Sequence, residues 1–339
     1  MKLGVLLNAE YPAGELVELG RLVEDLGYDQ LWYTDVRMFR ECYLGLAAIA
    51  ANTRRIRLGP GVTDPYSRHP AVTASTIATL DEMSGQRALL GLGVGSTGFR
   101  ELGIRAEHPV SALRETVGLV RRLLQGEDIT FQGKVISLAA GKLQFTPVRT
   151  EIPIYFATQG ARITELAGEV ADGVMIANAA LASAVDFYLE GVRRGAEKGR
   201  RPLSHIDVAL RFEMCISDDP AEAEAVMRRR VAMRVAAGYG HWDYLERFGI
   251  TLPQAFIDIA ASRNLRAAAE ASHLLPREAV ERMALAGDSD GVAAQLAAAI
   301  RPGVTRLIVR PHAPPGGSVG EVLRRFANEV APRIGPAAH

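Results

Sequence analysis

Residues 57–70 read Arg-Leu-Gly-Pro-Gly-Val-Thr-Asp-Pro-Tyr-Ser-Arg-His-Pro, and this stretch decides the fold. An apolar run ends in Gly-Pro-Gly, a polar loop follows, and Pro70 begins a helical pattern at a position where its missing N–H costs nothing. The loop carries five hydrogen-bonding side chains, those of Asp64, Tyr66, Ser67, Arg68 and His69. A strand end, a glycine-rich turn and a helix start are typical of a ligand-binding corner in a parallel α/β protein. The alternative is an ordinary polar connection, for which Gly-Pro-Gly is a costly choice.

The composition argues against several classes of function. The chain has 339 residues, 48% of them apolar, which suits two ordinary domains or one large α/β barrel. Lys+Arg and Asp+Glu both number 39, so nothing favours nucleic acid or an anionic membrane as a partner. Cys42 and Cys215 lie far apart, without the spacing of a disulfide scaffold or a metal site. No apolar run reaches the ~18 residues of a membrane span or forms a signal peptide, so we expect a soluble, cytoplasmic protein.

The apolar pattern alternates between buried strands and amphipathic helices. The predicted strands are residues 3–7, 30–34, 55–58, 88–92, 152–157, 173–177, 206–216 and 304–309. The predicted helices are residues 15–26, 44–51, 71–83, 110–124, 161–167, 182–198, 220–237 and 319–330.

Eight strands in this order predict an α/β fold, a (β/α)8 TIM barrel with insertions, as a single domain over residues 1–339. The insertions are a small hairpin at 128–140 and a helical segment at 238–286, which we interpret as a lid. A two-domain Rossmann arrangement would need a linker and a shift in composition near the middle of the chain, and neither occurs.

In a (β/α)8 barrel the active site is assembled from residues that directly follow the strands. These include Asp35, Arg37, Arg40, Tyr43, Gly61, Val62, Gly93, Gly95, Ser96, Thr97, Thr158, Gln159, Gly160, Asn178, Arg310 and His312. Gly160 opens a helix directly after a strand, which predicts an anion site suited to a phosphate. The sequence holds no nucleophile elbow and no carboxylate pair with catalytic spacing, so we expect a cofactor to carry the chemistry.

Several of these residues also have a purely structural interpretation. Asp35 can pair with Arg37 or Arg40, and His69 can cap the helix that follows it. Residues 93–98 match G-x-G-x-x-G after a strand, but the apolar helix of a dinucleotide fingerprint does not follow. A Rossmann dehydrogenase therefore has little support.

Four segments resemble the bacterial luciferase-like superfamily of flavin- and deazaflavin-dependent oxidoreductases, and most closely its methylene-tetrahydromethanopterin reductase branch. They are residues 58–70, residues 32–35 with Arg40 and Tyr43, residues 157–160 with 165–174, and residues 287–288 with the last strand and helix. The resemblance implies a (β/α)8 barrel and a non-prolyl cis peptide at Gly61–Val62 that supports the cofactor ring. It also implies a homodimer built through the helices at 44–51 and 71–83.

The resemblance implies hydride transfer between reduced coenzyme F420 and a small organic substrate. The cofactor-binding residues it implies are Asp35, Arg40, Gly61, Val62, Ser67, Arg68, Gly93, Ser96, Thr158, Gln159, Gly160, Ala177 and Asn178. The candidate catalytic residues are Asp35, Tyr66 and His69, the last two as proton donors, and no metal site is expected. The alternatives are an FMN-dependent monooxygenase of the same family and a non-catalytic flavin-binding barrel.

The pterin substrate of that branch does not follow from the resemblance. Deazaflavin-using relatives often carry His after the strand-two Asp, and this chain has Val36 there. The methanopterin reductases carry acids where this chain has Ser96 and, in the first strand, Leu6 and Leu7. The sequence therefore predicts the class of cofactor but does not identify the substrate.

Overall fold

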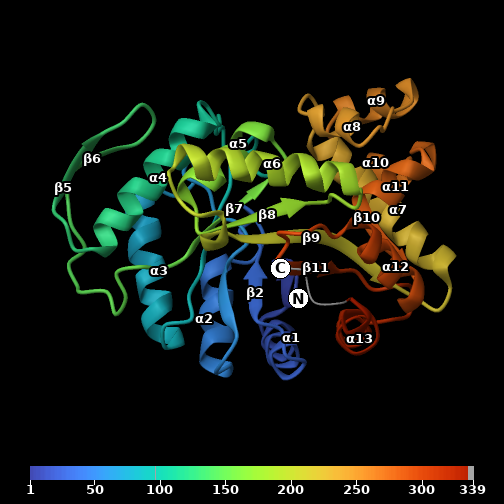
Figure 1. The fold of residues 1–339 in the computed structure, drawn as a ribbon, viewed down its shortest axis with the longest axis horizontal. Helices are drawn as coiled ribbons and strands as arrows, with labels where there is room; N and C mark the ends of the chain where they lie inside the picture. Colours follow the sequence, from blue (N-terminus) through green and yellow to red (C-terminus); the bar gives the residue numbers. More distant parts are fainter. Residues whose placement is uncertain (96, 335–339) are drawn as a thin grey trace. The chain divides into compact units, whose positions relative to one another are not determined.

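The computed structural model describes residues 1–95 and 97–334, in which strands and helices alternate (Figure 1). Eight strands form the main path of the sheet: β1 (Lys2–Leu7), β2 (Gln30–Tyr33), β3 (Arg57–Pro60), β4 (Leu90–Leu92), β7 (Ile154–Thr158), β8 (Gly173–Ala177), β9 (Asp207–Ile216) and β11 (Arg306–Pro311). The helices that alternate with them are α1 (Ala13–Asp25), α2 (Cys42–Asn52), α3 (Pro70–Ser84), α4 (Pro109–Leu124), α5 (Ala161–Val170), α6 (Ala182–Lys198), α7 (Pro220–Ala237) and α13 (Val319–Arg325). Parallel strands in this alternation confirm the predicted (β/α)8 fold class.

The chain folds into two compact units. The first, which we call the N-terminal unit, comprises Gly4–Met175 and Gly191–Asp207. The second, the C-terminal unit, comprises Met1–Leu3, Ile176–Glu190 and Val208–His339. The assignment of residues 1–339 to a single domain stays a prediction.

Glycines set the spacing of the strands in the N-terminal unit. β1, β2 and β3 pair in parallel, and β3 continues to β4 through bridges at Leu58–Ala88 and Thr63–Leu92. A Cβ added to Gly59 would lie 1.9 Å from the Leu89 carbonyl oxygen, and one on Gly91 would lie 2.1 Å from that of Pro60. The two strands approach so closely that only glycine fits at these positions.

A buried chain of hydrogen bonds crosses the inside of this unit. Trp32 Nε1 donates to Gln30 Oε1 at 3.1 Å, and Gln30 Nε2 donates to the Tyr155 hydroxyl at 3.0 Å. The Tyr155 hydroxyl in turn donates to Asp207 Oδ2 at 2.7 Å. Each polar group on the path has a partner, so the network orders the core without leaving an unpaired group.

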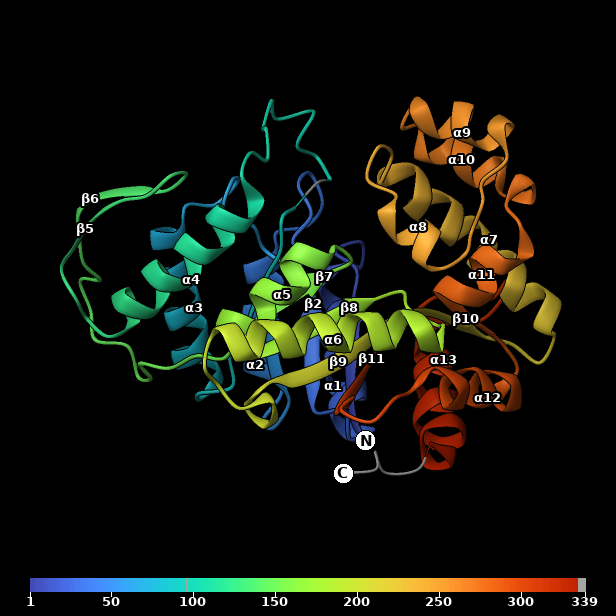
Figure 2. The ribbon, with the colours of Figure 1, turned by 45° about the horizontal axis from the view of Figure 1, so that its top comes forward.

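The predicted hairpin is present as β5 (Ile129–Gln132) and β6 (Ser137–Gly141), an antiparallel pair beside α4 (Figures 1 and 2). Glu115 of α4 holds its turn by accepting three consecutive backbone N–H groups. These belong to Lys134, Val135 and Ile136, at 2.8, 3.0 and 2.9 Å.

In the C-terminal unit, β10 (Ala284–Gly287) and β11 each pair with β9 in parallel. Residues 238–286 hold the predicted short helices α8 (Asp243–Arg247), α9 (Gln254–Ala261), α10 (Leu265–Glu270) and α11 (Arg277–Met283), which gather with α7 in Figure 2. The last predicted helix, residues 319–330, is present as α13 continued by the π-helix η3 (Phe326–Val330). Turns of 3-10 helix occur at η1 (Leu203–His205), η2 (Ser272–Leu274) and η4 (Ala331–Arg333). Sequence analysis missed β10 and α12 (Ser289–Ala299), because both are rich in alanine and lack a clear apolar period.

No helix within residues 1–95 and 97–334 is long and apolar enough to cross a membrane.

Glu24 of α1 fixes the entry to β3. Its carboxylate accepts the backbone N–H groups of Arg54, Arg55 and Ile56 at 2.9, 2.6 and 2.8 Å. Burial acts to raise the pKa of Glu24, but the three backbone donors outweigh it and the pKa is lowered. This stabilisation is therefore present above the unfolded pKa of about 4.3 and is lost as the pH falls through the lower folded value.

We expect Glu24→Gln to lower the free energy of unfolding by about 1–2 kcal/mol at pH 7, because hydrogen bonds to a charged group contribute about 1.5–3 kcal/mol and the amide retains part of them. Urea unfolding at pH 7 and pH 3 measures this, and the difference from wild type should shrink at pH 3. Glu18→Gln, on an exposed pair with Arg21, is the control and should change little. An equal effect of E24Q at both pH values would contradict the role of the charge.

Candidate functional site

The corner after β3 contains the predicted cis peptide at Gly61–Val62, which is confirmed. A Cβ on Gly61 would lie 2.7 Å from Leu6 Cδ1 and 2.8 Å from Trp32 Cβ, and one on Gly93 would lie 2.6 Å from Val62 Cγ2. Packing against neighbouring side chains of the barrel therefore requires glycine at both positions. The role of Gly61 and Val62 in supporting a cofactor ring stays a prediction.

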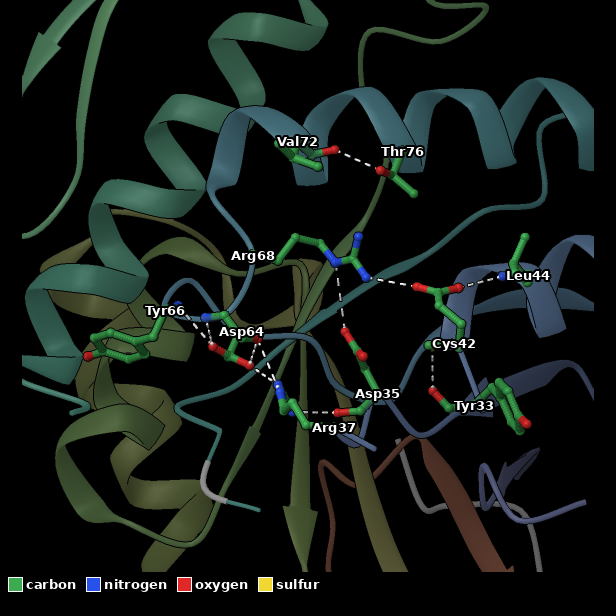
Figure 3. A network of polar contacts seen from close by, with 12 residues as sticks. Tyr33, Asp35, Arg37, Cys42, Leu44, Asp64, Tyr66, Arg68, Val72 and Thr76 are labelled. Atoms are coloured by element: carbon green, nitrogen blue, oxygen red, sulfur yellow. Dashed lines mark hydrogen bonds and ion pairs between the residues drawn. The ribbon is translucent and has the colours of Figure 1, made fainter. Parts of the chain in front are cut away.

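Asp64 organises the loop that follows this corner, and it is only 1% exposed. Its carboxylate accepts the backbone N–H groups of Tyr66 at 2.9 Å and Ser67 at 2.8 Å, and the Ser67 hydroxyl at 2.8 Å. It also forms an ion pair with Arg37, which donates through Nη1 to the Asp35 carbonyl oxygen at 2.6 Å (Figure 3). The loops after β2 and β3 are thus joined through one buried carboxylate.

Arg68 connects the same two loops from the other side. Its Nη2 donates to Glu41 Oε1 at 2.8 Å, and its Nε lies 4.0 Å from Asp35 Oδ2 (Figure 3). Its guanidinium carbon lies 4.7 Å from the centre of the Tyr43 ring, a cation–π contact. The predicted residues Asp35, Ser67 and Arg68 are therefore brought together, with Tyr43 beneath the guanidinium.

Three buried polar atoms of this corner form no hydrogen bond of ordinary geometry within the described residues, although the Tyr43 and Thr63 hydroxyls interact with each other and Arg68 Nε lies 4.0 Å from Asp35. They are the Tyr43 hydroxyl, the Thr63 hydroxyl and Nε of Arg68. Burial raises the pKa of Tyr43 well above its usual value, so its hydroxyl keeps its proton and remains a donor. Unpartnered buried polar groups are rare in folded proteins, and a bound polar ligand would satisfy them.

The two predicted proton donors each form hydrogen bonds within the protein. The Tyr66 hydroxyl donates to the Glu107 carbonyl oxygen at 2.8 Å, and burial, with the charge of Glu107, raises the pKa of Tyr66 to about 12. His69 caps α3, its Nδ1 accepting the Ala71 N–H at 3.1 Å, and its Nε2 lies 2.9 Å from the Ser137 carbonyl oxygen in the hairpin. A role in proton transfer for either residue would require one of these bonds to break.

The start of α5 is open where the sequence predicts an anion site. Thr158 is buried, and its hydroxyl lies 3.2 Å from the Gly160 nitrogen and 3.0 Å from its carbonyl oxygen. A Cβ on Gly160 would meet nothing within 4 Å. Gln159 is partly exposed between them. The geometry is compatible with an anion at the helix terminus.

Four predicted residues remain. Arg40 is exposed and donates to the Glu10 carbonyl oxygen at 2.6 Å. Ser96 lies outside the described residues. Ala177 ends β8 in the C-terminal unit, and Asn178 follows with φ 57°.

Sequence analysis missed two charged residues of the C-terminal unit. Arg211 and Glu213 of β9 are each 5% exposed, and Arg211 donates to Asn178 Oδ1 at 2.9 Å and to Glu213 Oε1 at 3.0 Å. Two charged residues spaced by two within the apolar run 208–216 lie on one face of the strand, and that period was a usable signal.

In the part of the chain that the structure describes, no group of three or more His, Cys, Asp or Glu side chains could hold a metal ion.

Replacing Asp64 by Asn should reduce the free energy of unfolding by about 3 kcal/mol, because it leaves Arg37 without its buried partner. Urea unfolding measures this change. The half-exposed pair of Asp29 with Arg57 provides the control, since Asp29→Asn should cost less than about 1 kcal/mol. Similar losses in the two variants would show that the Asp64 pair is no stronger than a surface pair.

Comparison with known proteins gives a consistent picture. A family model described as luciferase-like monooxygenase matches residues 1–306. A 5,10-methylenetetrahydromethanopterin reductase from Methanolobus tindarius is 38% identical over 77% of this chain and 79% of its own length. The enzyme of that name from Archaeoglobus fulgidus is 31% identical over 98% of this chain and 100% of its own. The solved coenzyme F420-dependent tetrahydromethanopterin reductase of Methanopyrus kandleri has a TM-score of 0.86 at 28% identity, covering 98% of this chain and 99% of that one.

Proposed function

Because this chain belongs to the luciferase-like monooxygenase family, we propose that it is an oxidoreductase that transfers a hydride between coenzyme F420 and a small organic substrate. The similarity to the coenzyme F420-dependent enzyme of Methanopyrus kandleri covers nearly the whole chain. The observation that carries the proposal is the corner after β3, where Asp35, Tyr43, Thr63 and Arg68 gather and the Tyr43 hydroxyl, the Thr63 hydroxyl and Arg68 Nε are buried without a hydrogen bond of ordinary geometry.

The residues of this corner fit a polar aromatic cofactor. Arg68 and Asp35 would bind its polar edge, and the backbone at Gly61–Val62 would support its ring. The open start of α5 at Gly160 would hold an anionic group of its tail. Asn178 and the other residues predicted from the sequence stay proposals for the same group.

When bound, the deazaflavin supplies two-electron hydride chemistry. The protein holds the reactants in place and excludes water. Asp64 keeps the two loops in position by binding both Ser67 and Arg37. Arg68 is held by Glu41 and Tyr43, so its orientation is set before a ligand arrives.

Arg68→Met should weaken binding of coenzyme F420 by about 10- to 100-fold, because a hydrogen bond to a charged group contributes about 1.5–3 kcal/mol. Quenching of the cofactor's fluorescence on titration with protein measures this. Arg21→Met, on the exposed face of α1, is the control and should bind like wild type. Unchanged binding by R68M would remove Arg68 from the site.

An FMN-dependent monooxygenase is the second candidate, since the matching family model is described as a monooxygenase. Titration of the apoprotein with each cofactor separates the two candidates. Binding of FMN without binding of coenzyme F420 would reverse the preference.

We also propose that the protein acts as a homodimer in the cytoplasm, with α2 and α3 at the interface. Leu44 of α2 is 73% exposed and Val72 of α3 is 51% exposed, and large exposed apolar side chains on adjacent helices favour a protein partner.

The double change Leu44→Arg and Val72→Arg should convert the dimer to a monomer, because it places charges on the contact face. Light scattering after size exclusion gives the mass. Leu203→Arg, at an apolar residue that is 43% exposed elsewhere, should leave the dimer intact. A wild-type mass equal to one chain would contradict the dimer.

A further inference from the structure

Three large apolar side chains are exposed on the loops at the carboxyl ends of β2 and β4. Met38 is 69% exposed, Phe39 is 54% exposed and Leu102 is 52% exposed. All three lie in the N-terminal unit, as does the corner after β3. A (β/α)8 enzyme binds its substrate with the loops at this end of the strands, so exposed apolar side chains here call for a role. We name Met38, Phe39 and Leu102 the apolar rim.

The loops after β2 and β4 touch at Gly98. A Cβ on Gly98 would lie 2.7 Å from Arg37 Cβ and 3.5 Å from Met38 Cε, so the end of the Met38 side chain lies against the loop after β4. The Gly98 carbonyl oxygen accepts the Leu102 N–H at 3.2 Å. Met38 and Leu102 therefore adjoin the same glycine, and the two loops present their apolar side chains together.

Arg37 fixes the rim to the candidate cofactor corner (Figure 3). It forms the ion pair with Asp64, and it donates to the Asp35 carbonyl oxygen at 2.6 Å and to the Ser67 hydroxyl at 3.1 Å. Met38 directly follows Arg37 in the chain. The rim is therefore held beside the residues that we propose to bind the cofactor, and within the same compact unit.

The packing of these loops relies on Phe99 rather than on the rim. Phe99 is 6% exposed, and its ring centre lies 5.2 Å from the guanidinium carbon of Arg37 and 6.1 Å from the centre of the Tyr66 ring. A Cβ on Gly95 would lie 2.5 Å from Cζ of Phe99. The buried ring of Phe99 thus joins the loops after β2, β3 and β4, and the rim side chains stay available to a ligand.

The backbone of Met38 also points to a role for its side chain. The Phe39 N–H donates to the Val36 carbonyl oxygen at 3.3 Å, which closes a turn with Met38 at its third position and φ 63°. When φ is positive, that position usually carries glycine or asparagine, because a β-carbon is strained there. Glycine would suit the turn better, so the methionine is explained by what its side chain contacts. Methionine is flexible and polarizable, and it adapts to apolar ligands of varied shape.

The rim determines the chemistry of its ligand. None of its three side chains carries a charge or donates a hydrogen bond, and the half-buried Val36 beside it is also apolar. The charges next to Leu102 are those of Arg100 and Glu101, which cancel. A phosphate, a carboxylate or a pterin ring in contact with the rim would lose hydrogen bonds to water without replacement. An uncharged apolar group would instead be stabilised by burial there.

We propose that the apolar rim binds the apolar part of the substrate, and that this substrate is an uncharged alcohol or the corresponding carbonyl compound. This rests on the proposed function. In the oxidative direction the C–H bond of the alcohol carbon breaks, and its electron pair leaves with the hydrogen as a hydride to coenzyme F420. The O–H bond breaks, its proton goes to water, and the second C–O bond forms. In the reductive direction the same bonds break and form in reverse.

NMR of the protein labelled with ¹³C at its methionine methyl groups tests the contact without turnover. The chain has eight methionines, and the signal that is lost in Met38→Leu belongs to Met38. Titration with cyclohexanol should shift that signal in the wild-type protein, and titration with glucose 6-phosphate should not. A Met38 signal that cyclohexanol leaves unmoved, both with and without coenzyme F420, would overturn the proposal.

Steady-state kinetics with coenzyme F420 test the specificity. Met38→Gln and Leu102→Gln should each raise KM for cyclohexanol by about 10-fold and change kcat less than about twofold, since one methylene in an apolar site is worth about 10–200-fold and the rim takes no part in the chemical step. Leu203→Gln, at an apolar residue that is 43% exposed elsewhere, should behave as wild type. Met38→Gly should also raise KM while the protein stays folded in thermal melting, because glycine suits φ 63°.

The outcomes separate the two levels of the proposal. Failure of the wild type to bind coenzyme F420 would overturn the proposed function, whereas the NMR titration without cofactor still reports on the rim. Cofactor binding with no turnover of cyclohexanol, or with a higher kcat/KM for methylenetetrahydromethanopterin or glucose 6-phosphate, would overturn the substrate class alone. Unchanged KM in M38Q and L102Q would remove the rim from the substrate site. Loss of a wild-type dimer in these two variants, measured by light scattering, would assign the rim to a second copy of the chain and overturn the proposal.

Discussion

The close approach of β3 and β4 is the constraint on which the candidate cofactor corner depends. Gly59 and Gly91 allow the two backbones to approach to distances that no Cβ would permit. Gly93 likewise leaves room for the side chain of Val62. The Thr63 N–H then donates to the Gly91 carbonyl oxygen at 3.0 Å, and the Gly93 N–H donates to the Thr63 carbonyl oxygen at 2.9 Å. Glycine spacing along two short strands thus sets the direction in which the loop leaves the sheet.

Beyond this turn, two ion pairs hold the loop that follows β3. Asp64 binds the loop after β3 to Arg37, and Arg68 binds it to Glu41. Each ion pair joins two residues that are 27 positions apart in the chain. The segments that would meet a cofactor are therefore fixed by side chains that themselves need not react.

The sequence predicted the alternation of strands and helices and the hairpin, because these depend on local period and on residue type, whereas the cis peptide at Gly61–Val62 was expected from the family resemblance. It could not predict how Tyr66 and His69 use their polar atoms, since their partners lie 41 and 68 residues away. The pairing of Glu213 with His312, 99 residues apart, depends on the register of two strands and has no local signature. The strands and helices could be predicted from the sequence, and the hydrogen bonds between distant loops could not.

The anchoring of the hairpin has a consequence for engineering. Its turn is held by Glu115, while the Ser137 carbonyl oxygen meets His69 at the first turn of α3. His69 immediately follows Arg68 in the chain. A designer who exchanges residues 129–141 for a foreign hairpin would therefore also alter the start of α3, and through it the loop that carries Arg68.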